Sequence, residues 1–98
     1  MVHRPAMARK IADTLKELED VAEKKAIRIC YELIGGELGA GGLCKVKGHH
    51  RVIVDKRATD GEKVTVIASA LARFPLEDVF MSEDTRALID RHGSQRAG

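Results

Sequence analysis

Cys44, His49 and His50 are the residues whose types and proximity could support metal chemistry in this chain. A thiolate and two imidazoles are ligands that zinc and copper accept. A structural zinc site needs four ligands, however, and the other cysteine and histidines follow no C-x-x-C or H-x-x-x-H spacing. Neighbouring residues of a strand also point to opposite faces of the sheet. These three residues are therefore metal candidates only, and no cofactor is expected.

A catalytic cysteine would need a nearby histidine and a third group that orients it. No third group can be assigned, so Cys30 and Cys44 are expected to act as free, small apolar side chains. The glycine-rich segment 35–42 could cradle a phosphate, but phosphate-binding loops lead into a helix, and here a strand is predicted to follow. No catalytic residue is therefore predicted.

Basic residues are concentrated between residues 43 and 57, where the only acid is Asp55. On a two-stranded ribbon such side chains can neutralise phosphates. No aromatic residue lies among them to stack on bases, and lysines also protect exposed strand edges. Nucleic-acid binding is therefore an alternative hypothesis, with the candidate residues Lys45, Lys47, Arg51, Lys56 and Arg57.

A long amphipathic helix is predicted over residues 6–26. Its apolar positions recur at spacings of four, three and four residues, which places them on one stripe. The stripe can pack on the chain's own sheet or on the same helix of a second copy, so a homodimer is predicted. The candidate interaction residues are Ile11, Leu15, Leu18 and Ala22.

Three strands are predicted next, over residues 27–34, 43–47 and 51–55. The first alternates apolar and polar residues, which is typical of a half-buried strand. The other two form a hairpin connected by residues 48–50. The run Val52-Ile53-Val54 is continuously apolar, which predicts that both faces of this strand are covered.

A second helix is predicted to begin at Thr59, whose side chain forms a capping box with Glu62, with Asp60 as the competing cap. The helix is predicted to end at Phe74 because Pro75 follows. Its many small residues predict that it lies at the buried centre. Residues 79–81 are a candidate edge strand.

Ser82 is predicted to cap a last helix that runs to about Arg91, with Gly93 as its C-cap. The expected fold is α+β, with the long N-terminal helix, a small, mostly antiparallel sheet of three to four strands and two further helices, in the order α-β-β-β-α-(β)-α. Residues 1–98 are expected to form a single domain, with 1–5 and 94–98 disordered.

Residues 51–74, RVIVDKRATDGEKVTVIASALARF, resemble one part of the ImmA/IrrE-type zinc metallopeptidases. That family has an apolar strand, a short polar link and a helix that carries A-H-E-x-x-H. Ser69 and Arg73 stand where the resemblance would place the two histidine ligands, and Ala70 where it would place the glutamate base. Zinc hydrolysis needs those three side chains, so the resemblance implies a metal-free scaffold without activity.

The chain has 98 residues and a net charge of +2, and it shows no apolar stretch of signal-peptide or membrane-span length. A cytoplasmic location and no membrane partner are therefore expected. The absence of a catalytic constellation and the amphipathic helix together predict a non-catalytic interaction or regulatory module. Its expected partners are an unidentified protein and a second copy of the chain.

Overall fold

The computed structural model describes residues 10–34 and 41–96. It confirms an α+β chain with a three-stranded sheet and the element order α-β-β-β-α-α. The elements are α1 (Ile11–Lys24), β1 (Arg28–Glu32), β2 (Gly41–Val46), β3 (His49–Asp55), α2 (Asp60–Leu71) and α3 (Glu83–Arg96). None of the described helices is long and apolar enough to cross a membrane.

The sheet has the order β1-β3-β2 and is mixed. β2 and β3 form the predicted antiparallel hairpin, whereas β1 pairs parallel to β3. The prediction of a mostly antiparallel sheet is therefore wrong for β1. The reason lies in the two helices. α1 and α2 run in the same direction, with Ile11 of α1 close to Gly61 of α2. β1 follows α1 and β3 precedes α2, and each strand runs opposite to its helix, so the two strands are parallel to each other.

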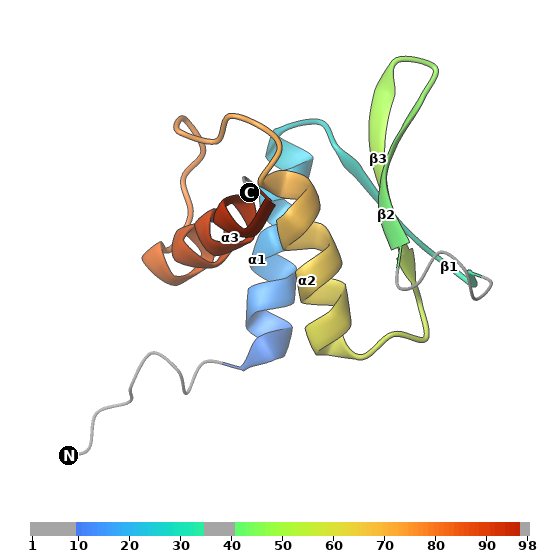
Figure 1. Cartoon of the computed structure of the whole chain (residues 1–98), viewed down its shortest axis with the longest axis horizontal. Helices are drawn as coiled ribbons and strands as arrows, with labels where there is room; N and C mark the ends of the chain where they lie inside the picture. Colours follow the sequence, from blue (N-terminus) through green and yellow to red (C-terminus); the bar gives the residue numbers. More distant parts are fainter. Residues whose placement is uncertain (1–9, 35–40, 97–98) are drawn as a thin grey trace.

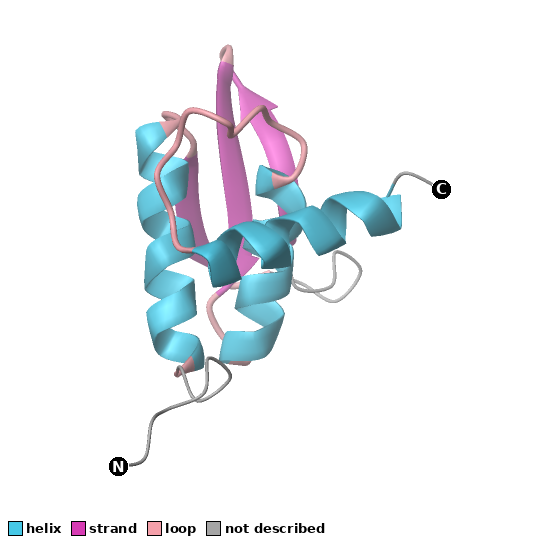
Figure 2. Cartoon of the chain, turned by 90° about the vertical axis from the view of Figure 1, so that its left-hand side faces the viewer, coloured by secondary structure: helices cyan, strands magenta, loops and turns pink. Residues whose placement is uncertain are grey.

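The molecule is built in three layers (Figure 1). α1 and α2 lie side by side over one face of the sheet, and α3 lies across them on the side away from the strands (Figure 2). Because no element of the described part covers the other face of the sheet, Ile53 stays half-exposed there while Val52 and Val54 are fully buried under the helices. The prediction that this strand is covered on both faces is wrong.

The apolar core lies between the sheet and the helix pair. α2 supplies its centre, as predicted, and Ile67 and Leu71 are fully buried there. Leu18 and Ala22 of α1 pack into the same cluster. Burial of such side chains is the main stabilising contribution in a domain of this size.

α1 ends in a turn that sets the start of β1. The amide of Ile27 donates to the carbonyl of Ala22 (2.9 Å), and the amide of Ala26 donates to Glu23 (3.0 Å). This is the Schellman pattern, and Ala26 occupies its left-handed position with φ 61°. The described helix is 14 residues long, so the long N-terminal helix is not confirmed. Its predicted first residues, 6–9, lie outside the described residues.

The β2–β3 turn consists of Lys47 and Gly48, with φ of 51° and 83°. Two successive residues with positive φ form the turn type that matches the twist of a hairpin. His49 and His50 consequently belong to β3, and the predicted three-residue connection is wrong. Gly41, with φ 129°, is required at the start of β2 because a Cβ there would lie 1.8 Å from the Ile53 carbonyl oxygen.

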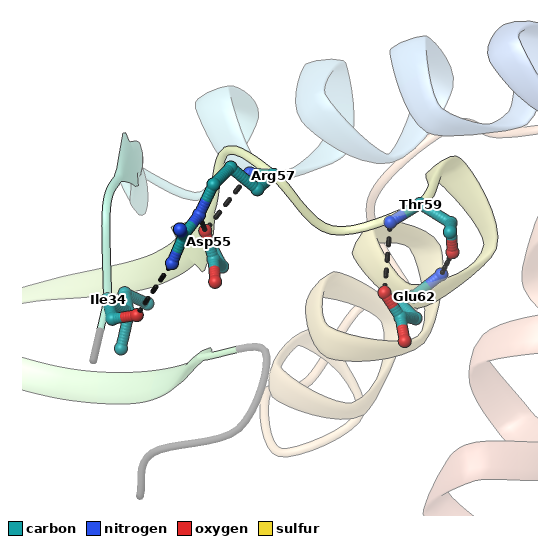
Figure 3. Close-up of polar contacts among 5 residues, drawn as sticks. All are labelled: Ile34, Asp55, Arg57, Thr59 and Glu62. Carbon is teal, nitrogen blue, oxygen red and sulfur yellow. Dashed lines mark hydrogen bonds and ion pairs between the residues drawn. The ribbon is translucent and has the colours of Figure 1, made fainter. Parts of the chain in front are cut away.

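The predicted capping box at the start of α2 is confirmed (Figure 3). Glu62 N–H donates to Thr59 Oγ1 (3.1 Å), and Thr59 N–H donates to the Glu62 carboxylate (2.9 Å). α2 ends at Leu71 rather than Phe74, since the chain tightens into a turn before Pro75.

The predicted fourth strand does not form in the described structure. Residues 79–81 lie in the connection to α3, with Val79 and Met81 buried and Phe80 86% exposed. The carbonyls of Leu76 and Val79 accept hydrogen bonds from the Arg86 guanidinium (3.3 and 2.6 Å) instead of from a neighbouring strand. The Arg86 side chain thus donates to two carbonyl groups of this connection, which in a strand would accept from the backbone of a neighbouring strand.

α3 begins at the predicted cap but ends later than expected. Ser82 Oγ accepts from the amide of Thr85 (3.2 Å), which confirms the cap. The helix continues through Gly93 to Arg96, so the predicted C-cap at Gly93 is wrong, whereas the disorder predicted from residue 94 onward stays a prediction. Glycine is tolerated inside a helix at a cost of about 1 kcal/mol. The predictions for residues 1–5 and 97–98 lie outside the described residues.

Glu17 ties α1 to the start of α3. Its carboxylate accepts from Ser82 N–H (2.6 Å), Ser82 Oγ (3.0 Å) and Thr85 Oγ1 (2.8 Å). Thr85 is a fully buried polar residue, and this bond satisfies its hydroxyl. A carboxylate at a helix N-terminus is also favoured by the helix dipole.

Candidate functional site

β1 is an edge strand whose outer side carries free backbone groups. Lys56 N–H donates to the carbonyl of Glu32 (3.0 Å), so the backbone groups of Glu32 point toward β3. The N–H and C=O of a strand residue point to the same side, and this side alternates along the strand. Ile29 and Tyr31 therefore direct their N–H and C=O groups away from β3, and no described backbone group pairs with them.

A groove of about 530 Å³ runs beside this edge, between α1 and β1. Glu19 and Glu23 form its helical wall, and Arg28, Ile29 and Tyr31 form its strand wall. A further strand can therefore approach the β1 edge, because α1 lies beside this edge and leaves the groove open. An exposed edge of this kind is a template for a further strand.

Tyr31 connects the two walls of the groove. Its hydroxyl donates to the Glu19 carboxylate, and the Lys63 ammonium lies 5.4 Å from the ring centroid. Burial raises the pKa of Tyr31 far above its ordinary value, and the bond to Glu19 and the charges of Glu19 and Asp60 raise it further. The phenol is consequently a permanent donor that links β1 to α1.

The uncovered face of the sheet carries two pairs of like charges. Arg28 pairs in register with Arg51, and Glu32 pairs in register with Asp55. All four lie on the face opposite Val52 and Val54, because side chains alternate along a strand. Like charges directly opposite one another in a sheet are destabilising. No ion pair in the described ranges involves Arg28, Arg51 or Glu32.

A basic notch of about 290 Å³ lies where β1 begins beside the first residues of β3. It is lined by Ala26, Arg28, His49, His50 and Arg51. Two guanidinium groups at one notch can bind a phosphate or carboxylate through paired N–H donors. Sequence reasoning missed Arg28 here, because only the strand register brings it beside Arg51.

The predicted nucleic-acid residues do not form one surface. Lys45 and Lys47 lie at the hairpin end of β3, and Lys56 and Arg57 lie beyond its other end, about 20 Å away for a strand of this length. Arg57 is also engaged, since it ion-pairs with Asp55 (3.6 Å) and donates to the carbonyl of Ile34 (3.3 Å) (Figure 3). Only Arg51 of the predicted set lines the notch.

The metal candidates are not brought together. His49 and His50 project from opposite faces of β3, and His50 packs edge-on against Phe74 at 4.8 Å. Cys44 is exposed on β2, in register with Arg51. Among the described residues no group of three or more His, Cys, Asp or Glu side chains could hold a metal ion.

The α1 stripe is used mainly inside the molecule. Leu18 and Ala22 are fully buried and Leu15 is half-buried, whereas Ile11 is 46% exposed. Leu18 and Ala22 thus take the intramolecular use of the stripe, and contact of the stripe with a partner stays a prediction. The amphipathic pattern alone could not separate these two uses of the stripe.

Ser69 and His92 form a contact that the sequence did not reveal. Ser69 Oγ on α2 lies 3.2 Å from His92 Nδ1 on α3. Burial lowers the pKa of His92, and the neighbouring Arg91 charge lowers it further, so the neutral ring is favoured. A serine nucleophile would also need a group orienting the histidine, and no described side chain bonds to the other ring nitrogen. The contact is best described as an interhelical polar bridge.

Ser69 and Arg73 line a second groove, of about 280 Å³, between α2 and β2. They lie one helical turn apart, at the two positions where the resemblance to zinc metallopeptidases would place histidines. Ala70, where the resemblance would place the glutamate base, is buried. No known protein-family model matches the chain, and neither curated proteins nor solved structures provide a match.

Proposed function

We propose that this chain is a non-catalytic interaction module that accepts an extended protein segment along the free edge of β1. The observation that carries the proposal is the outward direction of the Ile29 and Tyr31 backbone groups beside an accessible groove. Strand addition uses such groups for affinity and adjacent pockets for specificity. The groove supplies the pocket, with Glu19 and Glu23 on its wall.

Selection from a displayed library of short random peptides tests this function. Bound peptides are expected to shift the amide resonances of Ile29 and Tyr31 and to lose affinity for an Ile29→Pro variant. Proline at this position removes an outward donor and no bond to β3, so the fold is expected to persist. Circular dichroism checks that the variant is folded.

Cys44→Ser is the matched control on the opposite edge strand. The proposed function fails if selection gives no binder, or if the binders shift residues of β2 and leave those of β1 unchanged. It also fails if a folded Ile29→Pro variant binds the selected peptides as tightly as the wild type does.

A second candidate function is phosphate recognition in nucleic acid, now centred on the basic notch. It is favoured by the adjacent Arg28 and Arg51, which form no ion pair with a described residue. Mobility shifts measured over a salt series test it. Arg51→Gln is expected to weaken binding and to reduce the slope of log K against log salt by about 1, while Lys56→Gln at the far end of β3 has a smaller effect. Absence of any shift at low salt would exclude this candidate.

A further inference from the structure

We propose that the segment received at the β1 edge is the β1 strand of a second copy of this chain, paired antiparallel about a two-fold axis at Cys30. This inference rests on the proposed function and names its partner. Two copies would join their sheets edge to edge into one continuous six-stranded sheet. Two-fold pairing requires a surface that is complementary to itself.

The backbone of β1 meets that requirement. In an antiparallel pair centred on Cys30, Ile29 lies opposite the partner's Tyr31, and Tyr31 opposite the partner's Ile29. These are the two residues whose N–H and C=O groups point outward. Both pairs are then hydrogen-bonded pairs, and Cys30 faces its symmetry mate as a non-hydrogen-bonded pair. If the register were shifted by one residue, Cys30 would lie opposite Ile29 or Tyr31 of the partner. The N–H and C=O groups of Cys30 point toward β3, so they could not bond to the partner strand.

The charges of β1 are complementary in the same register. Arg28 at the start of the strand lies opposite the partner's Glu32, and Glu32 lies opposite the partner's Arg28. Within one copy, Arg28 stands beside Arg51 and Glu32 beside Asp55, which are like-charge neighbours. Pairing therefore places Arg28 of each copy directly beside Glu32 of the other, and this attraction offsets the repulsion within each like-charge pair.

The opposite face of β1 is also suited to self-pairing. Ile29 and Tyr31 both project toward the helices, where Ile29 is half-buried and Tyr31 is 36% exposed. Antiparallel pairing sets each isoleucine beside the partner's tyrosine, and pairs of β-branched and aromatic residues stabilise neighbouring strands. The groove beside the edge offers the volume that these side chains enter.

The contact is short, since β1 has five residues. A dimer of moderate affinity is therefore expected, whose population depends on concentration. Sedimentation equilibrium over a concentration series measures it. A chain that remains monomeric at the highest soluble concentration would overturn the inference.

A charge swap tests the register without endangering the fold. Arg28→Glu places an acid opposite the partner's Glu32 in both halves of the dimer, and it is expected to weaken association tenfold or more. Within its own copy the new acid stands beside Arg51, so the monomer is not weakened. The double variant Arg28→Glu/Glu32→Arg is expected to restore association. Equal affinities of the wild type and the single variant would contradict the proposed register.

Cys30 provides a direct probe of the axis. Non-hydrogen-bonded partners of an antiparallel pair have Cα atoms about 4.5 Å apart, which a disulfide can span. Diamide, which accepts the two electrons, is expected to convert the Cys44→Ser variant into a covalent dimer and to leave the Cys30→Ser variant without a covalent cross-link. A dimer that cross-links only through Cys44 would place the interface elsewhere and refute the inference.

The two proposals fail in different ways. A monomeric wild type that still selects peptides at Ile29 and Tyr31 would reject the second copy as partner and retain strand addition. A dimer whose Cys30 does not cross-link, and which Arg28→Glu leaves intact, would reject this arrangement. Loss of both peptide binding and association would reject the β1 edge as a docking site.

Discussion

Replacing Glu17 of α1 by alanine is expected to lower the stability of the whole fold, because this side chain joins α1 to the start of α3. Its carboxylate accepts three hydrogen bonds at 2.6–3.0 Å, all from the first residues around α3. Hydrogen bonds to a charged acceptor contribute about 1.5–3 kcal/mol each, and they are not additive within one group. Truncation also removes the charged acceptor of the buried Thr85 hydroxyl, which keeps only its contact with Ser82 Oγ (3.1 Å). We therefore expect Glu17→Ala to lower the free energy of unfolding by about 3 kcal/mol.

Urea and thermal unfolding followed by circular dichroism measure this loss. For a chain of this size, about 3 kcal/mol corresponds to a fall in Tm of roughly 12–24 °C. Glu17→Gln keeps one acceptor oxygen and is expected to lose about half as much. Glu23→Ala on the same helix is the control, because Glu23 is exposed and a surface change costs less than about 0.5 kcal/mol. If the Glu17 and Glu23 alanine variants were equally stable, α3 would not be anchored through Glu17.

Three further predictions concern stability. Gly41→Ala is expected to destabilise strongly, because its Cβ would overlap the Ile53 carbonyl, whereas Gly42→Ala, which meets nothing within 4 Å, is expected to be nearly neutral; thermal unfolding of both tests this. Ala26→Gly should raise the free energy of unfolding by about 0.5–1 kcal/mol in urea titrations, since glycine suits the left-handed position. Because the pKa of His92 is lower in the folded chain, the unfolded chain binds the extra proton first, and stability should fall as pH drops below about 6.5; His92→Gln should remove this part of the pH dependence.

Local signals were sufficient for much of the fold. The capping box of Thr59 and Glu62 and the cap at Ser82 depend on residues within one turn of each other, and both are present. The small residues of α2 likewise predicted its central position correctly. By contrast, the parallel pairing of β1 follows from the placement of two helices, which no local pattern encodes. The missing fourth strand follows from Arg86, a side chain that reaches back to carbonyls of the preceding connection.

The candidate site was harder to predict, because it depends on contacts between residues that are far apart in the sequence. The basic set 45–57 is contiguous in sequence, but a strand of seven residues separates its two ends. Arg28 and Arg51 come from different parts of the chain, and only the register of β1 with β3 unites them. The alternation of β1 was visible in the sequence, yet which of its backbone groups stay free depends on which side β3 occupies.

The turn at Ala26 and Ile27 has a consequence for how the chain tolerates insertions. This turn sets the number of residues between the end of α1 and the first residue of β1. That number determines which side chains of β1 face the helices. One extra residue there would rotate the alternation by half a period, exposing Ile29 and driving the Arg28 and Glu32 charges against the core. Length variation in this chain should therefore be confined to other connections, and a single-codon insertion at this corner should be among its least tolerated changes.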